Sequence, residues 1–214
     1  MNRRGFFSSV FHSRADKDPF FFGVQCVINI AGEDALRTNL HRVIASGGES
    51  ELPADKHSLY KRVTALLRES VPLMEYGYWD YLTDGDEATE EFNNWVGEIE
   101  ATMATEEEEV GDAADEAFRL SADKNYVVVT MAFLLEAENL QEEVCNIVEA
   151  VEEKDYFTPY GFQRLIEAVN YIDFEYSLGD AVFIMPGNET DGFSWTDMRG
   201  EGWEYLKPIM GTIN

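Results

Sequence analysis

The chain has 214 residues, of which 45% are hydrophobic and 13% are aromatic, so it holds enough apolar material for a folded core. Its 42 Asp and Glu residues against 16 Lys and Arg residues give a net charge of −26. This charge argues against nucleic-acid binding, which depends on Lys and Arg to neutralise phosphates. It favours a basic protein partner or metal ions, although a salt-rich habitat or simple colloidal solubility explains the same composition without a ligand. No apolar run approaches the roughly 18 residues that span a bilayer, so no transmembrane segment is expected.

Residues 1–18 are expected to form a flexible, basic and aromatic tail ahead of a single domain that spans residues 19–214. Residues 1–17 hold four cationic side chains and one anionic side chain, together with three phenylalanines. Such a tail suits peripheral contact with an anionic membrane surface or docking on its own domain, and a frayed terminus is the alternative. Arg3-Arg4 resembles the start of a twin-arginine signal, but no apolar region or cleavage site follows. We therefore expect an uncleaved, cytoplasmic protein.

The first third of the domain predicts one strand and two amphipathic helices. Apolar residues alternate along Phe20–Ile30, which predicts a strand. Apolar residues at helical spacing then run from Glu33 to the glycine pair at residues 47–48, a typical helix end. A second helix is predicted from Lys56, and Pro72 is expected to end or kink it.

An aromatic group follows this second helix and is the first candidate for a binding surface. It consists of Tyr76, Tyr78, Trp79 and Tyr81. Tyr and Trp contribute strongly to protein–protein interfaces, so one interpretation is a recognition surface. The more common use of such residues is to fill the space between helices.

The rest of the chain predicts further helices around a central strand. An amphipathic helix is expected from Ala88 to Met103. The glutamates at residues 106–109 interrupt its apolar stripe, and Thr105–Leu120 is expected to form a short, solvated helix or a helical connection. Tyr126–Leu135 is rich in β-branched residues without polar alternation, which predicts a strand buried on both faces. An amphipathic helix should follow to about residue 153, and another should begin at Thr158-Pro159.

The C-terminal part predicts one more strand region and an irregular end. Phe174–Met185 is either a hairpin that turns at Gly179-Asp180 or a single strand entered through a loop. Glycines are frequent from about residue 187 onward, which predicts an irregular segment anchored by aromatic residues. These elements together predict an α+β fold, in which a small mixed or antiparallel sheet of three to four strands is covered by several amphipathic helices.

No arrangement of residues typical of catalysis or cofactor binding is present. His12, His41 and His57 lie outside any nucleophile or zinc motif, and all three are expected at the surface. No glycine loop precedes a helix in the way that phosphate binding requires. Cys26 and Cys145 lie in apolar patterns and are expected to be buried thiols. We therefore predict no catalytic residues and no cofactor.

A weak calcium-loop candidate lies in the acidic segment from Asp80 to Glu91. Asp80, Asp84, Gly85 and Glu91 match the template at its first, fifth, sixth and twelfth positions, and Asp86 adds a further carboxylate. Leu82 stands where another oxygen ligand is needed. The alternative is a capped turn, in which Asp84 or Asp86 accepts hydrogen bonds from the first helical N–H groups.

From about Leu59 to the C-terminus, the chain resembles the bacterial, cyanobacterial and plastid family called domain of unknown function 1517. The resemblance is carried by short segments: Leu66–Arg68, Tyr78-Trp79, Glu91-Phe92, Tyr126–Thr130, Ala181–Pro186 and Tyr205–Pro208. Met185-Pro186 stands where that family has Trp-Thr-Pro, and Trp203–Tyr205 stands in place of a Tyr-Pro. The family has no agreed reaction, and its plastid members look like accessory proteins of photosynthetic acclimation. The resemblance therefore implies a regulatory or scaffolding role.

These observations predict a non-enzymatic interaction or regulatory protein whose acidic surface binds a basic protein partner. One alternative is an inhibitor or immunity-like protein that occupies the basic cleft of a nuclease or toxin. The other is a metal-binding protein or metal-dependent enzyme built from carboxylates.

Overall fold

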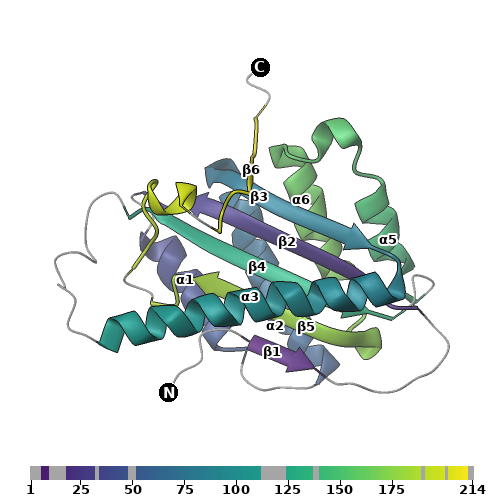
Figure 1. The fold of residues 1–214 in the computed structure, drawn as a ribbon. Coiled ribbons are helices and arrows are strands. Elements are labelled where there is room, and N and C mark those ends of the chain that lie inside the picture. The colour runs from purple at the N-terminus through teal and green to yellow at the C-terminus, as the bar shows by residue number, and fades with distance from the viewer. Residues whose placement is uncertain are drawn as a thin grey trace.

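A computed structural model describes residues 6–9, 18–31, 34–47, 52–111, 124–136, 140–188, 191–200 and 202–211 (Figure 1). Its centre is an antiparallel sheet in the order β1-β5-β4-β2-β3-β6. The strands are β1 (Phe6–Ser9), β2 (Phe20–Asn29), β3 (Met74–Leu82), β4 (Tyr126–Leu135), β5 (Ser177–Met185) and β6 (Lys207–Pro208). The α+β class is confirmed, and the sheet is larger than the three to four strands expected.

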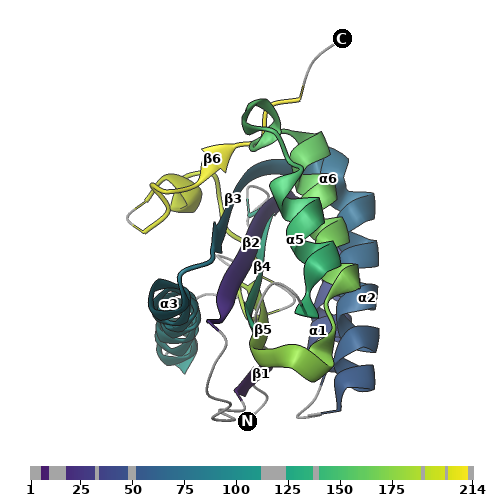
Figure 2. The ribbon, with the colours of Figure 1, turned by 90° about the vertical axis from the view of Figure 1, so that its right-hand side faces the viewer.

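Helices cover both faces of this sheet (Figure 2). Four helices lie on one face and the long helix α3 crosses the other, where Phe193, Met198, Trp203 and Leu206 also pack. The helices are α1 (Asp34–Ala45), α2 (Pro53–Ser70), α3 (Gly85–Gly111), α5 (Glu142–Glu149) and α6 (Pro159–Ala168). Short 3₁₀ turns connect them: η1 (Val71–Leu73), η3 (Glu153–Asp155), η4 (Val169–Tyr171), η5 (Phe174–Tyr176) and η6 (Asp197–Arg199). Among the helices of the described residues, none is long and apolar enough to cross a bilayer.

The central strands are buried because each faces a hydrophobic layer on both sides. All ten residues of β4 are buried, which confirms the prediction from its uninterrupted apolar run. In β2, Phe20 and Phe22 pack toward α2 and α6, whereas Phe21 packs toward α3. Phe22 stacks on Phe133 of β4 with ring centroids 6.2 Å apart. Burial of this many large side chains is the main contribution to folding.

The main departure from the sequence prediction is β3. The aromatic segment was expected between helices, but Met74–Leu82 forms a nine-residue strand paired with β2. Most residues of β3 are only partly buried. Its sequence accordingly shows neither the continuous apolar run of β4 nor a strict alternation of apolar and polar residues, which are the patterns that predict a strand. The region from residue 174 is a single strand: η5 leads directly into β5, which excludes the hairpin.

Helix α3 continues to Gly111, past the glutamates at residues 106–109 that interrupt its apolar stripe, so the first part of the expected short helix or helical connection belongs to the same helix. Glutamate is a good helix former, and a helix can continue without an apolar stripe. The remainder of the predicted 105–120 segment lies outside the described residues. Of the predicted tail, Phe6–Ser9 pairs with β5, and the other residues up to residue 17 lie outside the described part.

His41 was expected at the surface, but the structure buries it, with 4% of the side chain exposed. The reason is that α1 packs against both α2 and β5, so a position that looks polar in the sequence lies inside. His57 is exposed as expected, and His12 lies outside the described residues. Cys26 and Cys145 are both buried thiols, and burial raises the pKa of Cys26 to about 12.

Candidate functional site: an acidic, aromatic groove beside strand β3

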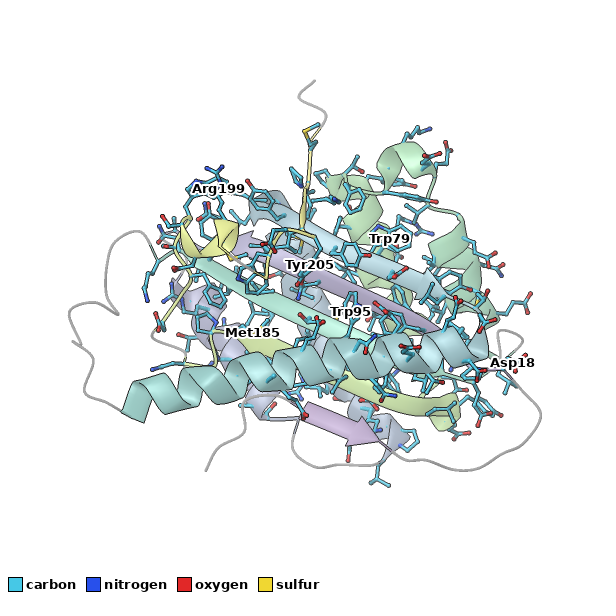
Figure 3. The ribbon with its side chains drawn as sticks, viewed as in Figure 1. Asp18, Trp79, Trp95, Met185, Arg199 and Tyr205 are labelled. Carbon is cyan, nitrogen blue, oxygen red and sulfur yellow. The ribbon has the colours of Figure 1, made fainter. Side chains whose placement is uncertain are left out.

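The four aromatic candidates all lie on β3, where the strand pleat directs them to opposite faces. Tyr76 and Tyr78 pack toward α3, and the ring of Tyr78 lies 5.9 Å from Trp95. Trp79 and Tyr81 pack toward the other helices. All four are partly exposed, so they line the edge of the sheet and are neither a closed core nor an open surface. Figure 3 shows Trp79 on this edge, beside the segment that leads into α6.

Beside this edge is a groove of about 500 Å³ between β3 and the end of α5, referred to below as the edge groove. Its lining combines aromatic, aliphatic and acidic side chains: Tyr78, Trp79, Asp80, Tyr81, Val148, Glu149, Val151, Tyr156 and Phe157. No Lys or Arg is among these lining residues. The groove therefore offers aromatic faces and negative charge without a cation of its own.

Trp79 contacts the segment around Tyr156, which forms the wall of the groove that faces β3. Its indole Nε1 donates a hydrogen bond to the carbonyl oxygen of Tyr156 at 3.0 Å, and the two rings meet edge to face with centroids 4.9 Å apart. The Tyr156 segment is further held by the start of α6, where Thr158 Oγ1 accepts from Gly161 N at 3.1 Å. A side chain at position 161 would put its Cβ 1.9 Å from Asp155 O, so only glycine allows this close packing.

Two carboxylates lie at the groove with their oxygens close to Tyr81. Asp80 Oδ1 accepts from the backbone N–H of Tyr81 at 2.8 Å, and Glu149 Oε1 accepts from the Tyr81 hydroxyl at 3.4 Å. Burial raises the pKa of Tyr78, and the nearby Asp80 and Glu91 carboxylates raise it further. Tyr78 therefore stays neutral at physiological pH, and the formally charged side chains of the groove lining are those of Asp80 and Glu149.

The calcium-loop candidates are used elsewhere in the fold. Asp84 Oδ1 accepts from Glu87 N at 3.2 Å at the start of α3, as the capped-turn alternative predicted. Glu91 accepts from Trp95 Nε1 at 2.8 Å, and Asp86 is exposed in the first turn of α3. Across the described ranges, no group of three or more His, Cys, Asp or Glu side chains is placed to hold a metal ion.

A buried polar cluster that the sequence analysis missed connects α2 to β5. Lys56 Nζ lies 2.6 Å from Asp180 Oδ1, and the Tyr60 hydroxyl donates to Asp180 Oδ2 at 3.1 Å. Asp180 is fully buried and Lys56 is 6% exposed. Burial and the Asp180 charge raise the pKa of Tyr60 well above its usual range, so it remains a donor. The only sequence signals were Lys56 at an inward helical position and Asp180 inside a strand pattern.

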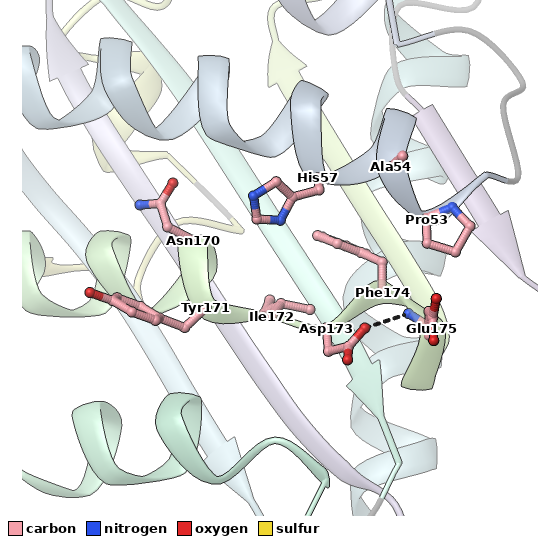
Figure 4. Close-up of a pocket in the computed structure, with 9 residues that line it drawn as sticks. All are labelled: Pro53, Ala54, His57, Asn170, Tyr171, Ile172, Asp173, Phe174 and Glu175. Carbon is pink, nitrogen blue, oxygen red and sulfur yellow. Dashed lines mark hydrogen bonds between the residues drawn. The ribbon is translucent and has the colours of Figure 1, made fainter.

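A second hollow, of about 420 Å³, lies over this cluster between the start of α2 and residues 170–175 (Figure 4). Phe174 separates it from the cluster by stacking on the ring of Tyr60 at 5.1 Å. His57 lies with its ring centroid 6.5 Å from that of Phe174, and Asp173 accepts from Glu175 N at 3.0 Å. Among these lining residues, His57 and Asp173 form no hydrogen bond with each other, so this hollow is the weaker candidate for acid–base chemistry.

Comparison with known proteins adds no functional residue to this description. The chain matches no protein-family model, and no curated protein and no solved structure shows significant similarity to it.

Proposed function

We propose that this protein is a non-enzymatic binding protein that recognises the basic surface of a protein partner through the edge groove. The observation that carries the proposal is the combination of Asp80 and Glu149 with five aromatic residues in a groove whose lining holds no Lys or Arg. Aromatic faces attract ammonium and guanidinium groups, and carboxylates pair with them. The resemblance to domain of unknown function 1517, which implies an accessory role, is compatible with this proposal.

The charge of the whole chain supports the same conclusion through long-range attraction. A net charge of −26 produces a field that speeds encounter with a cationic surface and repels anionic ones. Such attraction is weakened by salt, because the Debye length falls from about 14 Å at 50 mM to about 6 Å at 300 mM ionic strength. Binding to a basic partner should therefore depend strongly on salt.

The proposal is tested by affinity capture with the full chain, washed at about 50 mM and then at about 300 mM NaCl. We expect partners with basic surfaces that elute at the higher salt. The double variant Asp80→Asn/Glu149→Gln should capture clearly less, since it removes both groove charges and keeps the oxygens that bond to Tyr81. Glu69→Gln/Glu100→Gln is the matched control, because it changes the net charge equally at exposed positions on α2 and α3.

A partner list without basic surfaces, or capture that does not change with salt, would contradict the proposal. Recovery of a nuclease or toxin whose activity is lost on mixing would identify the partner as the target of an inhibitor.

A further inference from the structure

The outer edge of β3 is only partly occupied by a strand. β6 pairs with β3 at Tyr76 and Gly77 alone, and the described part of the chain adds no strand beyond them. Leu206 N donates to Trp203 O at 3.1 Å, so residues 203–206 form a turn, and the strand pairing with β3 does not extend into them. Figure 1 shows the consequence: β6 lies at the start of β3, and the rest of β3 is the edge strand of the sheet.

The backbone of Trp79 faces this open edge. Ile209 N donates to Glu75 O at 2.9 Å, so Glu75 presents its carbonyl to the β6 side. Residues two apart in a strand present their N–H and C=O groups to the same side, which gives Gly77 and Trp79 the same direction. The pairing of β2 agrees. Ile30 N donates to Asn125 O on the β4 side, so by alternation Gln25 directs its backbone groups toward β3, where its partner is Tyr78. The backbone of Tyr78 therefore faces β2, and that of the next residue, Trp79, faces the open edge.

The edge groove lies directly along this part of β3. A strand placed in line with β6 would cross the space between Trp79 and the wall formed by Val151 and Tyr156. Its side chains would meet aromatic rings that accommodate the stems of Lys and Arg, and the carboxylates of Asp80 and Glu149 would meet their charged ends. β6 itself shows that the same edge accepts an extended segment carrying a lysine, since Lys207 pairs with Gly77.

We propose that the edge groove binds an extended, Lys- or Arg-containing segment of the partner protein, which adds to the sheet as a strand in line with β6. This inference rests on the proposed function, because it specifies how the basic partner is recognised. Main-chain hydrogen bonds to the β3 edge would supply affinity in a sequence-independent way. The acidic, aromatic groove would select segments in which cationic residues alternate, so that they all face the same side.

The test uses the full chain and a labelled, capped peptide with the sequence Thr-Lys-Val-Arg-Val-Lys-Thr, whose three cations share one face. Two further peptides carry N-methyl groups on alternate amides, one set on each edge of the extended peptide. A strand pairs through one edge only, so we expect one N-methylated peptide to bind at least about tenfold more weakly and the other to bind within about threefold of the parent. Asp80→Asn/Glu149→Gln should weaken the parent peptide by about threefold to tenfold, and Glu69→Gln/Glu100→Gln should not.

Amide hydrogen exchange gives an independent readout. Saturating peptide should slow exchange of the Trp79 N–H, and the Tyr78 N–H, which faces β2, is the internal control. Equal binding of both N-methylated peptides would overturn strand addition, while a loss of affinity in the carboxylate variant would still support charge recognition. Failure of the parent peptide to bind would overturn the inference as well, and salt-sensitive capture of a basic protein would then leave the proposed function standing.

Discussion

The buried Lys56–Asp180 pair makes the sharpest prediction about stability. The two charged atoms lie 2.6 Å apart, with side chains that are 6% and 0% exposed. Lys56→Met removes the cation and leaves the Asp180 carboxylate in the core, where water cannot replace the lost partner. Removing one member of a buried pair typically costs about 3–5 kcal/mol. A domain of this size has a total stability of roughly 5–15 kcal/mol, so the variant should be much less stable.

Urea unfolding followed by the fluorescence of the four tryptophans measures this loss. We expect the free energy of unfolding of Lys56→Met to fall by about 3–5 kcal/mol and its Tm to fall by roughly 6–20 °C. The double variant Lys56→Met/Asp180→Leu should recover a large part of the loss, because it removes both charges. It should not recover all of it, because the buried hydroxyl of Tyr60 loses its acceptor.

The matched control is Lys154→Met. Lys154 pairs with Glu152 at 2.7 Å, but the two side chains are 70% and 68% exposed. Its unfolding midpoint should stay at the wild-type value, since water screens exposed pairs. The reasoning would be refuted if Lys56→Met changed stability no more than Lys154→Met, or if the double variant were as unstable as the two single losses combined.

Three further predictions concern packing, ionisation and thiol reactivity. Gly161→Ala should lower stability by about 1–3 kcal/mol in the same urea assay, because the new Cβ would lie 1.9 Å from Asp155 O; an unchanged midpoint would show that this close contact is absent. Burial and a hydrogen bond to Glu75 raise the pKa of Tyr126 from 10.0 to about 12, so its contribution to stability is complete below pH 10 and is lost between pH 10 and 12. Tyr126→Phe should lose less stability than wild type over that interval, and parallel curves would count against this assignment. Cys26, with a pKa raised to about 12, should react with a thiol reagent at about pH 8 only after unfolding; labelling of Cys26 in the native state, located by peptide mapping, would contradict its burial.

The sequence predicted the helices and the central strands well because their apolar patterns are strong. The unbroken apolar run at Tyr126–Leu135 indicated a strand covered on both faces, and the structure buries all ten of its residues. Thr158 and Pro159 marked the start of α6 correctly, with Thr158 capping the Gly161 N–H. Local chemistry is sufficient for such elements, since a cap or an apolar period acts within a few residues.

The sequence did not reveal β3 because an edge strand lacks the pattern on which prediction depends. Most of its residues are half-buried on both faces, so the apolar and polar positions neither alternate nor form a continuous run. The aromatic group was recognised as a candidate interaction surface, but its position beside Glu149 and Tyr156 depends on contacts between residues about 70 positions apart. No local rule predicts such contacts.

By itself, the sequence determined the helix-rich α+β class, the buried central strand and the excess of negative charge, because these follow from composition and local periodicity. Only the tertiary structure decided that β3 is an edge strand, that its aromatic residues form a groove with Asp80 and Glu149, and that Lys56 pairs with Asp180 inside the core. The physical reason is that strand order and buried charge pairing are set by which distant segments bury each other's surface, and this is a property of the whole fold.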